Sequence, residues 1–151
     1  MTVRISAPTR SERPRNLDLP SLRSTAGRAL RALGHTRSEI SVSLVSDEEI
    51  SDLNEAWRGK KGPTDVLSFS LFEGEHREYR GKMLGDIVIG LSAAQRQARD
   101  RHRSLDDEVA RLLIHGLLHL LGHDHEVEAE ARRMRVEERR LLRETGPRGA
   151  P

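Results

Sequence analysis

Hydrophobic residues recur along the chain with two periods, and the change from one period to the other marks the expected elements. Apolar residues at alternate positions, or in a short apolar run, predict strands at residues 3–5, 40–44, 66–72 and 86–89. Apolar residues three and four positions apart predict helices at residues 20–33, 46–57, 92–100, 104–121 and 126–143. Because no repeat or linker divides this series, we expect one domain over residues 1–143 and a disordered tail over residues 144–151.

Polar residues at the helix starts support this division. Ser46 with Glu49, and Ser92 with Gln95, fit the capping-box pattern, in which the first side chain accepts from the backbone N–H three residues on. The fourth expected helix begins with a serine and three acidic residues, which suit its positive end. It is then apolar on nearly every side, so we expect it to be buried.

Composition narrows the class of protein. The 151 residues are 35% hydrophobic and 33% charged, which fits one soluble globular domain. A net charge of +2 does not by itself indicate a nucleic-acid-binding protein. The absence of cysteine excludes disulfides and cysteine-rich zinc sites. Neither a signal peptide nor a membrane-spanning run is recognisable, so we expect a cytoplasmic protein without a membrane partner.

One segment, HGLLHLLGHDH at residues 115–125, holds four of the seven histidines. His115 and His119 are about one helical turn apart and therefore share a face of the expected helix. Gly122 favours the left-handed turn that ends a helix, after which the chain can fold back and bring His125 to the other two. Three imidazoles that meet at one point predict a transition-metal site, most naturally one zinc ion with a fourth position for water.

Other interpretations of these residues compete with the metal site. A single buried histidine is usually a hydrogen-bonded core residue, but three in a leucine-rich segment would each need a separate buried partner. His123 or Asp124 could be the fourth ligand of a structural zinc, although we favour Asp124 as a carboxylate that accepts from a ligand N–H. For His123, an exposed position in the turn and a role in proton transfer are equally good explanations.

Zinc with an open position implies hydrolase or lyase chemistry, because the ion acidifies bound water and stabilises charge on a bound oxygen. Zinc peptidases of the H-E-x-x-H type carry a glutamate base directly after the first histidine. Gly116 occupies that position here, which weakens a peptidase interpretation.

A basic, glycine-rich loop precedes the third expected strand. Arg58, Lys60 and Lys61 place three cations close together, and such side chains bind phosphate. For the loop taken alone, a solvated basic turn is the commoner explanation. Trp57, next to the loop, could stack one nucleobase or could end the apolar face of its helix.

The histidine segment is similar to the H-G-x-L-H-L-x-G-Y-D-H signature of the YbeY endoribonucleases, the bacterial rRNA maturation factors. Three further blocks resemble that family in the same order, namely LNEAWRGK at 53–60, PTDVLSF at 63–69 and LGDIVI at 84–89. The resemblance covers about residues 40–142. His123 replaces the family's tyrosine, so no phenol is available there, and Ser70 replaces a common proline.

This resemblance implies a single α+β domain, with a four-stranded mixed sheet packed with helices and a metal site in a cleft at the end of a buried helix. It implies zinc, or another divalent transition metal, on His115, His119 and His125, and a catalytic role for these residues together with Arg58. It also implies single-strand-specific endoribonuclease activity in rRNA maturation, especially at the small-subunit rRNA 3′ end, and in ribosome quality control. The implied partners are precursor rRNA and the ribosome or its small subunit, without DNA.

We therefore expect a metal-dependent endoribonuclease in which Arg58 binds the scissile phosphate and Lys60 and Lys61 bind neighbouring phosphates. Either water or the ribose 2′-hydroxyl could be the attacking group. Two alternatives stay open. One is a zinc peptidase-like metal hydrolase, and the other is a non-catalytic ribosome-assembly factor whose metal only stabilises the fold.

Overall fold

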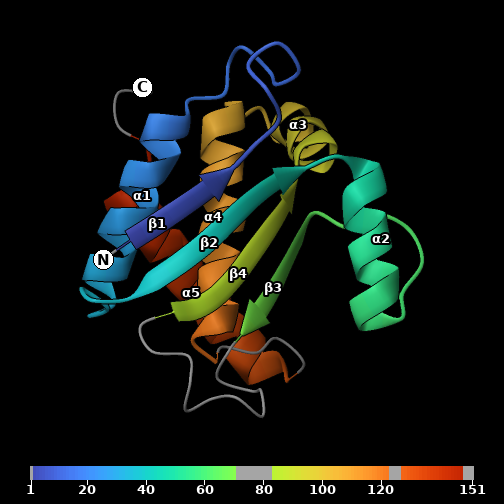
Figure 1. Cartoon of the computed structure of the whole chain (residues 1–151). Helices are drawn as coiled ribbons and strands as arrows, with labels where there is room; N and C mark the ends of the chain where they lie inside the picture. Colours follow the sequence, from blue (N-terminus) through green and yellow to red (C-terminus); the bar gives the residue numbers. More distant parts are fainter. Residues whose placement is uncertain (1, 71–82, 123–126, 148–151) are drawn as a thin grey trace.

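The computed structural model describes residues 2–70, 83–122 and 127–147. These ranges form four strands and five helices, in the order β1 (Thr2–Ser6), α1 (Leu19–Ala32), β2 (Glu39–Val45), α2 (Asp47–Arg58), β3 (Val66–Ser70), β4 (Met83–Gly90), α3 (Leu91–Asp100), α4 (Leu105–Leu120) and α5 (Glu128–Thr145) (Figure 1). Within the described ranges, the periodicity of the sequence predicts the type and order of these elements correctly.

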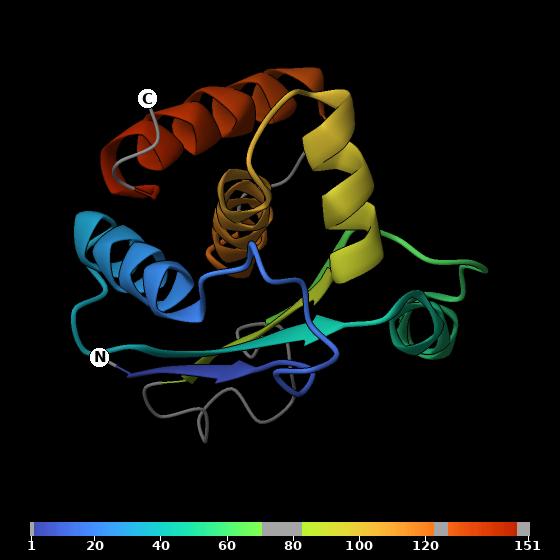
Figure 2. The ribbon, with the colours of Figure 1, turned by 90° about the horizontal axis from the view of Figure 1, so that it is seen from above.

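One mixed sheet carries the domain. Its strand order is β1-β2-β4-β3; the first three strands in this order run parallel, and β3 is antiparallel to β4. Seen from above, α1, α3 and α4 lie on one side of the sheet, and α5 forms a further layer outside α4 (Figure 2). The structure thus confirms a single α+β domain with a four-stranded mixed sheet.

Strand alternation divides the core between the two faces of the sheet. Ile87 and Ile89 of β4 belong to the main cluster with α1 and α4, whereas Val88 belongs to a smaller cluster with Ile50 of α2 and Leu67 of β3. Helices α2 and α4 therefore flank β3 from opposite faces. α4 is buried along most of its length, as its apolar sequence predicts. Among the described helices, none combines the length and hydrophobicity that crossing a membrane would require.

The helix caps agree with the sequence pattern at α2 and differ from it at α3. The Ser46 hydroxyl accepts from the Glu49 amide at 3.2 Å, so the predicted N-cap is confirmed, and it donates to the Glu49 carboxylate at 3.3 Å. The box predicted at Ser92 is wrong. β4 runs directly into α3, which has Gly90 as its N-cap and no side-chain bond there, so no turn remains in which a serine could cap.

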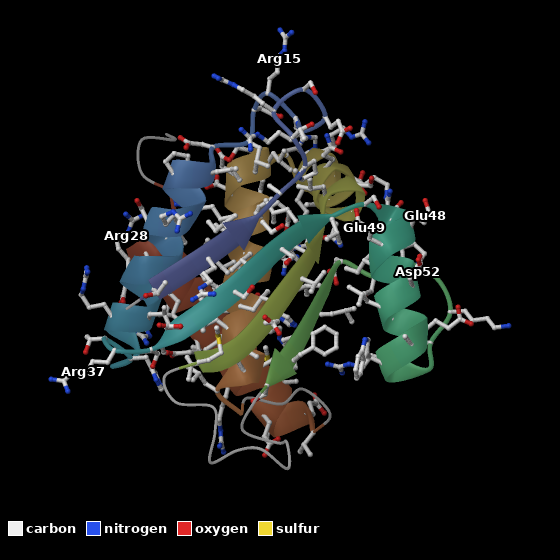
Figure 3. All side chains as sticks on the ribbon, viewed as in Figure 1. Arg15, Arg28, Arg37, Glu48, Glu49 and Asp52 are labelled. Carbon is white, nitrogen blue, oxygen red and sulfur yellow. The ribbon has the colours of Figure 1, made fainter. Side chains whose placement is uncertain are left out.

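The C-terminal helix is longer than its sequence pattern indicates. A tail was expected from residue 144, but α5 runs to Thr145, which is buried. The Thr145 hydroxyl donates to the Leu141 carbonyl at 2.6 Å, and Arg28 of α1 (Figure 3) donates to the Thr145 carbonyl from Nε and Nη2 at 3.1 and 2.9 Å. This long-range anchor, which no local pattern reveals, holds the last turn of α5. Residues 148–151 lie outside the described ranges.

Candidate functional site

His115 and His119 lie in the C-terminal half of α4. The helix is fixed at its start by Ser104, whose hydroxyl accepts from the Asp107 amide at 3.0 Å, and the chain turns away after it at Gly122, where φ is 95°. The two imidazole rings have their centroids 4.9 Å apart, with 63° between the ring planes. Zinc–nitrogen bonds of about 2.0–2.1 Å are compatible with this separation, so one ion could bind both rings.

Gly116 lets α4 lie directly against the sheet. A Cβ atom at this position would be 2.8 Å from Ile87 Cγ2 in β4 and 3.4 Å from Val66 Cγ2 in β3, and the first distance is too short for a real contact. The missing side chain therefore places His115 and His119 close to β3. The glutamate that follows the first histidine in H-E-x-x-H peptidases would not fit at this position. The packing of α4 on the sheet therefore explains the glycine.

Helix α2 brings Arg58 to the same strand. A glycine with φ of 66° ends the helix, and Asn54 donates from Nδ2 to the Gly62 carbonyl at 3.0 Å, which folds the basic loop back onto α2. Arg58 Nη2 donates to the Ser68 carbonyl at 2.8 Å, and its guanidinium carbon lies 5.9 Å from the centroid of the Phe69 ring. Two contacts with β3 thus hold a guanidinium that is still exposed.

These side chains meet in one pocket of about 260 Å³ along β3. Its walls come from α2 and the following loop, from the start of β3 and from α4, and comprise Asn54, Arg58, Lys60, Thr64, Asp65, Val66, Leu67, Ser68, His115, Gly116 and His119. Within the described ranges β3 pairs only with β4, so the pocket follows the other edge of the strand. The structure therefore brings Arg58, Lys60, His115 and His119 together, and Lys61 does not line this pocket.

A carboxylate from α5 binds His115. Glu138 Oε1 lies 2.6 Å from His115 Nδ1, and the two side chains are 12% and 29% exposed. An ionised carboxylate only accepts, so Nδ1 is then the donor and Nε2 carries the lone pair that a metal ion binds. A carboxylate in this position is the usual support of a metal-binding imidazole. Sequence reasoning missed Glu138 and assigned this kind of role to Asp124.

Glu138 belongs to a polar network that joins three helices. Its second oxygen lies 3.7 Å from Arg111 Nη1, and Arg111 Nε donates at 2.5 Å to Glu108, a fully buried carboxylate. Arg111 Nη2 also donates to Gln97 of α3 at 3.4 Å, and Gln97 Nε2 donates to Asp65 Oδ2 at 3.1 Å. Because Asp65 lines the pocket, this network links two of its walls through the protein interior.

The described residues fit part of a metal site. The two histidines of α4 are nitrogen ligands of the kind that zinc prefers, and the carboxylate of α5 supports one of them. His125, the third expected ligand, lies outside the described residues, as do His123 and Asp124. Within the part of the chain that is described, no three histidine, cysteine, aspartate or glutamate side chains form a ligand set. The complete zinc site therefore stays a prediction.

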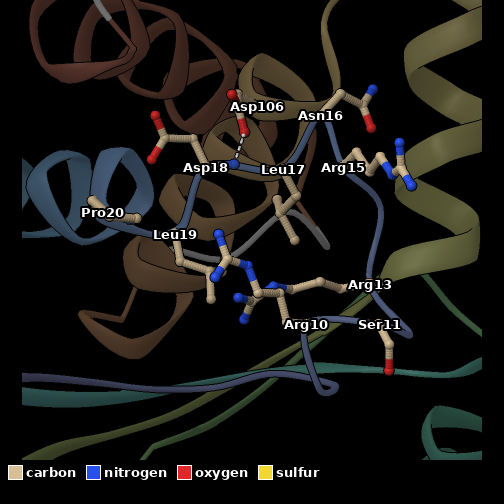
Figure 4. A pocket seen from close by; sticks show the side chains of 10 residues that line it. All are labelled: Arg10, Ser11, Arg13, Arg15, Asn16, Leu17, Asp18, Leu19, Pro20 and Asp106. Atoms are coloured by element: carbon tan, nitrogen blue, oxygen red, sulfur yellow. Dashed lines mark hydrogen bonds between the residues drawn. The ribbon is translucent and has the colours of Figure 1, made fainter.

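A larger hollow lies at the other end of α4. Its volume is about 1040 Å³, and its walls come from the loop before α1, the first turn of α1 and Asp106 (Figure 4). Burial raises the pKa of the Asp106 carboxyl above its usual value, although a hydrogen bond from the Asp18 amide at 2.8 Å opposes the rise. No histidine is among the residues that line this hollow. The smaller pocket, which Arg58, His115 and His119 line, is therefore the candidate functional site.

Comparison with known proteins relates the chain to one family. The family described as Endoribonuclease YbeY matches residues 10–146. Endoribonuclease YbeY of Anaeromyxobacter sp. (strain Fw109-5) is 49% identical over 151 residues, which cover 99% of this chain and 75% of that protein. Endoribonuclease YbeY of Anaeromyxobacter dehalogenans (strain 2CP-C) is 46% identical over 129 residues, which cover 85% of this chain and 65% of that protein.

A solved structure is similar in fold. The solution structure of TM1509 from Thermotoga maritima matches with a TM-score of 0.57 and 24% sequence identity, and the match covers 94% of this chain and 90% of that one.

Proposed function

Because the chain belongs to the Endoribonuclease YbeY family, we propose that it is a metal-dependent endoribonuclease that cuts single-stranded RNA in rRNA maturation. The observation that carries this proposal is the pocket along β3, where a cation suited to phosphate and two histidines suited to a metal ion line the same walls. The proposed substrate is precursor rRNA at the 3′ end of the small-subunit rRNA, and the proposed partner is the ribosome or its small subunit.

The metal would be one zinc ion per chain, or another divalent transition metal, held by His115, His119 and His125. When bound, it would supply Lewis-acid chemistry, activating the attacking oxygen and polarising the scissile phosphate. His115 and His119 contribute from α4, and Glu138 holds the His115 ring in the tautomer that binds through Nε2. Glu138 is thus a positioning residue that acts through His115.

Arg58 is the proposed phosphate-binding group. Its bond to the Ser68 carbonyl uses one N–H, and the planar guanidinium retains others for bidentate contact with a phosphate. Contact with the Phe69 ring restricts the side chain before RNA arrives, so less conformational entropy is lost on binding. A cation fixed in this way offsets the charge that grows on the phosphate in the transition state. Lys60 and Lys61 would hold neighbouring phosphates, Lys60 from the pocket wall.

Cleavage of single-stranded RNA, measured together with metal content, tests the proposal. We expect His115→Ala to lose both metal and cleavage. Arg58→Glu should lower turnover by about a hundredfold or more while metal content stays the same, because it replaces the phosphate-binding cation by an anion and changes none of the proposed metal ligands. Arg37→Glu reverses the charge of another exposed arginine, between α1 and β2 (Figure 3), and is the matched control.

Three outcomes would contradict these assignments. Cleavage by His115→Ala protein at the wild-type rate, in a preparation free of contaminating nuclease, would refute the metal-dependent mechanism. Equal loss of metal and turnover in Arg58→Glu would make the arginine structural. Hydrolysis of casein but not of RNA would favour a peptidase, against which the packing of Gly116 on Ile87 already argues.

A further inference from the structure

Trp57 is the most exposed large apolar side chain of the described residues. It is 71% exposed, whereas Val127 and Val136 are each 58% exposed. An indole left in water forgoes more hydrophobic stabilisation than other side chains, so its exposure needs an explanation. The residue lies in the last turn of α2, directly before Arg58. Trp57 follows the buried Ile50 by seven residues and so ends the apolar face of α2, but the indole itself is left largely in water.

The indole is held in place while most of its surface stays open. Trp57 packs edge-to-face on Phe69 of β3, with ring centroids 6.3 Å apart and 67° between the planes. Phe69 packs in turn on the cluster between α2 and the sheet, and the Arg58 guanidinium lies over its ring. One strand residue therefore positions both an aromatic ring and a cation beside the pocket.

We propose that Trp57 is a nucleobase subsite, on which one base of a single-stranded RNA stacks while Arg58 and Lys60 hold adjacent phosphates. This inference rests on the proposed function and deepens it. The base and phosphate of one nucleotide are covalently joined, so a ring and a cation on successive residues hold that nucleotide at two points. Aromatic stacking accepts any base, because every base has a π-face, so the subsite provides affinity without a strict sequence requirement.

The subsite gives single-strand specificity a physical cause. In a duplex each base is stacked between its neighbours and paired with its partner, so an exposed indole cannot reach its face. An unpaired base can splay out of the strand and stack on an aromatic side chain. A protein that binds in this way selects single strands by the accessibility of the base.

The distribution of charge along α2 directs RNA to the same place. The first half of the helix exposes Glu48, Glu49 and Asp52 (Figure 3), whereas its C-terminal end carries Arg58 and leads into the two lysines of the loop. A polyanion is repelled by the first half and attracted to the C-terminal end with its loop, where Arg58, Lys60 and Lys61 outnumber Glu55. The RNA backbone is therefore steered to the end of the helix at which Trp57 lies.

Trp57 is the only tryptophan of the chain, so tryptophan fluorescence reports on this residue alone. The full-length protein is titrated, with chelator present to keep the RNA intact, with a single-stranded RNA oligonucleotide and with a duplex of the same sequence. A third series uses single strands that lack one base at successive positions, and the anisotropy of labelled RNA gives the affinity. We expect saturable quenching by the single strand, little by the duplex, and a loss of affinity at one abasic position.

Variants then assign the effect to the indole. Trp57→Ala should weaken single-strand affinity by about five- to a hundredfold and should remove the penalty of the abasic position, whereas Trp57→Phe should keep most of the affinity. Val136→Ala removes another exposed apolar side chain and should bind RNA like the wild type. The abasic series on the wild type needs no variant, so a folding defect in Trp57→Ala would not remove the test.

Unchanged emission while RNA binds, or equal affinities of Trp57→Ala and Val136→Ala, would overturn the subsite. The proposed function would survive this result if the metal-loaded wild type still cleaved RNA. A wild type that neither bound nor cleaved RNA would overturn both proposals.

Discussion

The contact between Glu138 and His115 provides a test of the metal site at a single residue. Glu138→Gln replaces a charged acceptor by a weaker, neutral one at His115 Nδ1. Loss of such a support typically lowers metal affinity by about ten- to a hundredfold. We expect a decrease of that size in zinc affinity with a small change in melting temperature. Competition with a chromophoric chelator measures the first quantity, and thermal unfolding measures the second.

Glu137→Gln is the matched control for this prediction. Glu137 is the next residue in the chain, but its carboxylate pairs with Arg140 on α5. Its substitution should leave zinc affinity unchanged. Equal losses of zinc affinity in the two variants would show that total charge on α5, and not the contact with His115, supports the metal.

Residue types alone could identify the histidines of α4 but not their carboxylate partner. Helix α5 is rich in glutamate and arginine, and only the face of the helix on which it lies distinguishes Glu138 from the other glutamates. Glu138 follows the buried Met134 by four residues and precedes the buried Leu141 by three, so it lies on the inward face. A carboxylate on an apolar face is a usable signal. Its partner, however, lies 23 residues away on another helix, and only the packing of α5 on α4 reveals it.

At the scale of elements, the position of α4 depends on Gly116. Alanine is favoured over glycine in a helix interior by about 1 kcal/mol, but a Cβ atom 2.8 Å from Ile87 Cγ2 causes overpacking that typically costs about 1–3 kcal/mol. We therefore expect Gly116→Ala to lower the free energy of unfolding by up to about 2 kcal/mol, as measured by urea denaturation. The histidines on either side should then bind metal less well, because α4 must move away from the sheet.

A double variant isolates the contact that causes this loss. Ile87→Ala removes the atom that a Cβ at position 116 would meet. In that background Gly116→Ala should cost less, or should stabilise the protein through its helix propensity, so the two changes are not additive. Strict additivity would show that the close approach of α4 to β4 does not determine the effect.

Periodicity could predict the strands and helices, but not which helix covers which face of the sheet. Ile87 and Val88 of β4 are successive apolar residues, which point to opposite faces, so the sequence indicates that both faces of this strand are buried. Neither residue indicates that α2 packs on one face and α4 on the other. The pocket depends on that choice, because Arg58 and His115 approach β3 from different sides. Long-range packing determines which helix covers which face, and a local sequence pattern contains no information about that packing.

For the whole molecule, the contacts between helices decide whether the fold needs a metal ion. Ile114 and Leu118 of α4 form a buried cluster with Met134 and Leu141 of α5, and Arg28 of α1 binds the end of α5. No histidine takes part in these contacts. We therefore expect chelation to abolish RNA cleavage while the domain stays folded at room temperature. The lost binding energy should lower stability by about 3–4 kcal/mol if the metal had been present at about 100–1,000 times its Kd.

Circular dichroism and RNA cleavage, followed in one titration with chelator and then with zinc, separate an enzyme from an assembly factor with a structural metal. If the ion only held the last helix to the core, the helical signal would fall with chelation and the reloaded protein would cut no RNA. The apolar cluster between α4 and α5 already performs that structural task. A folded, metal-free protein that regains cleavage when zinc is added would therefore place the ion in the chemistry, because nothing else in the domain would have changed.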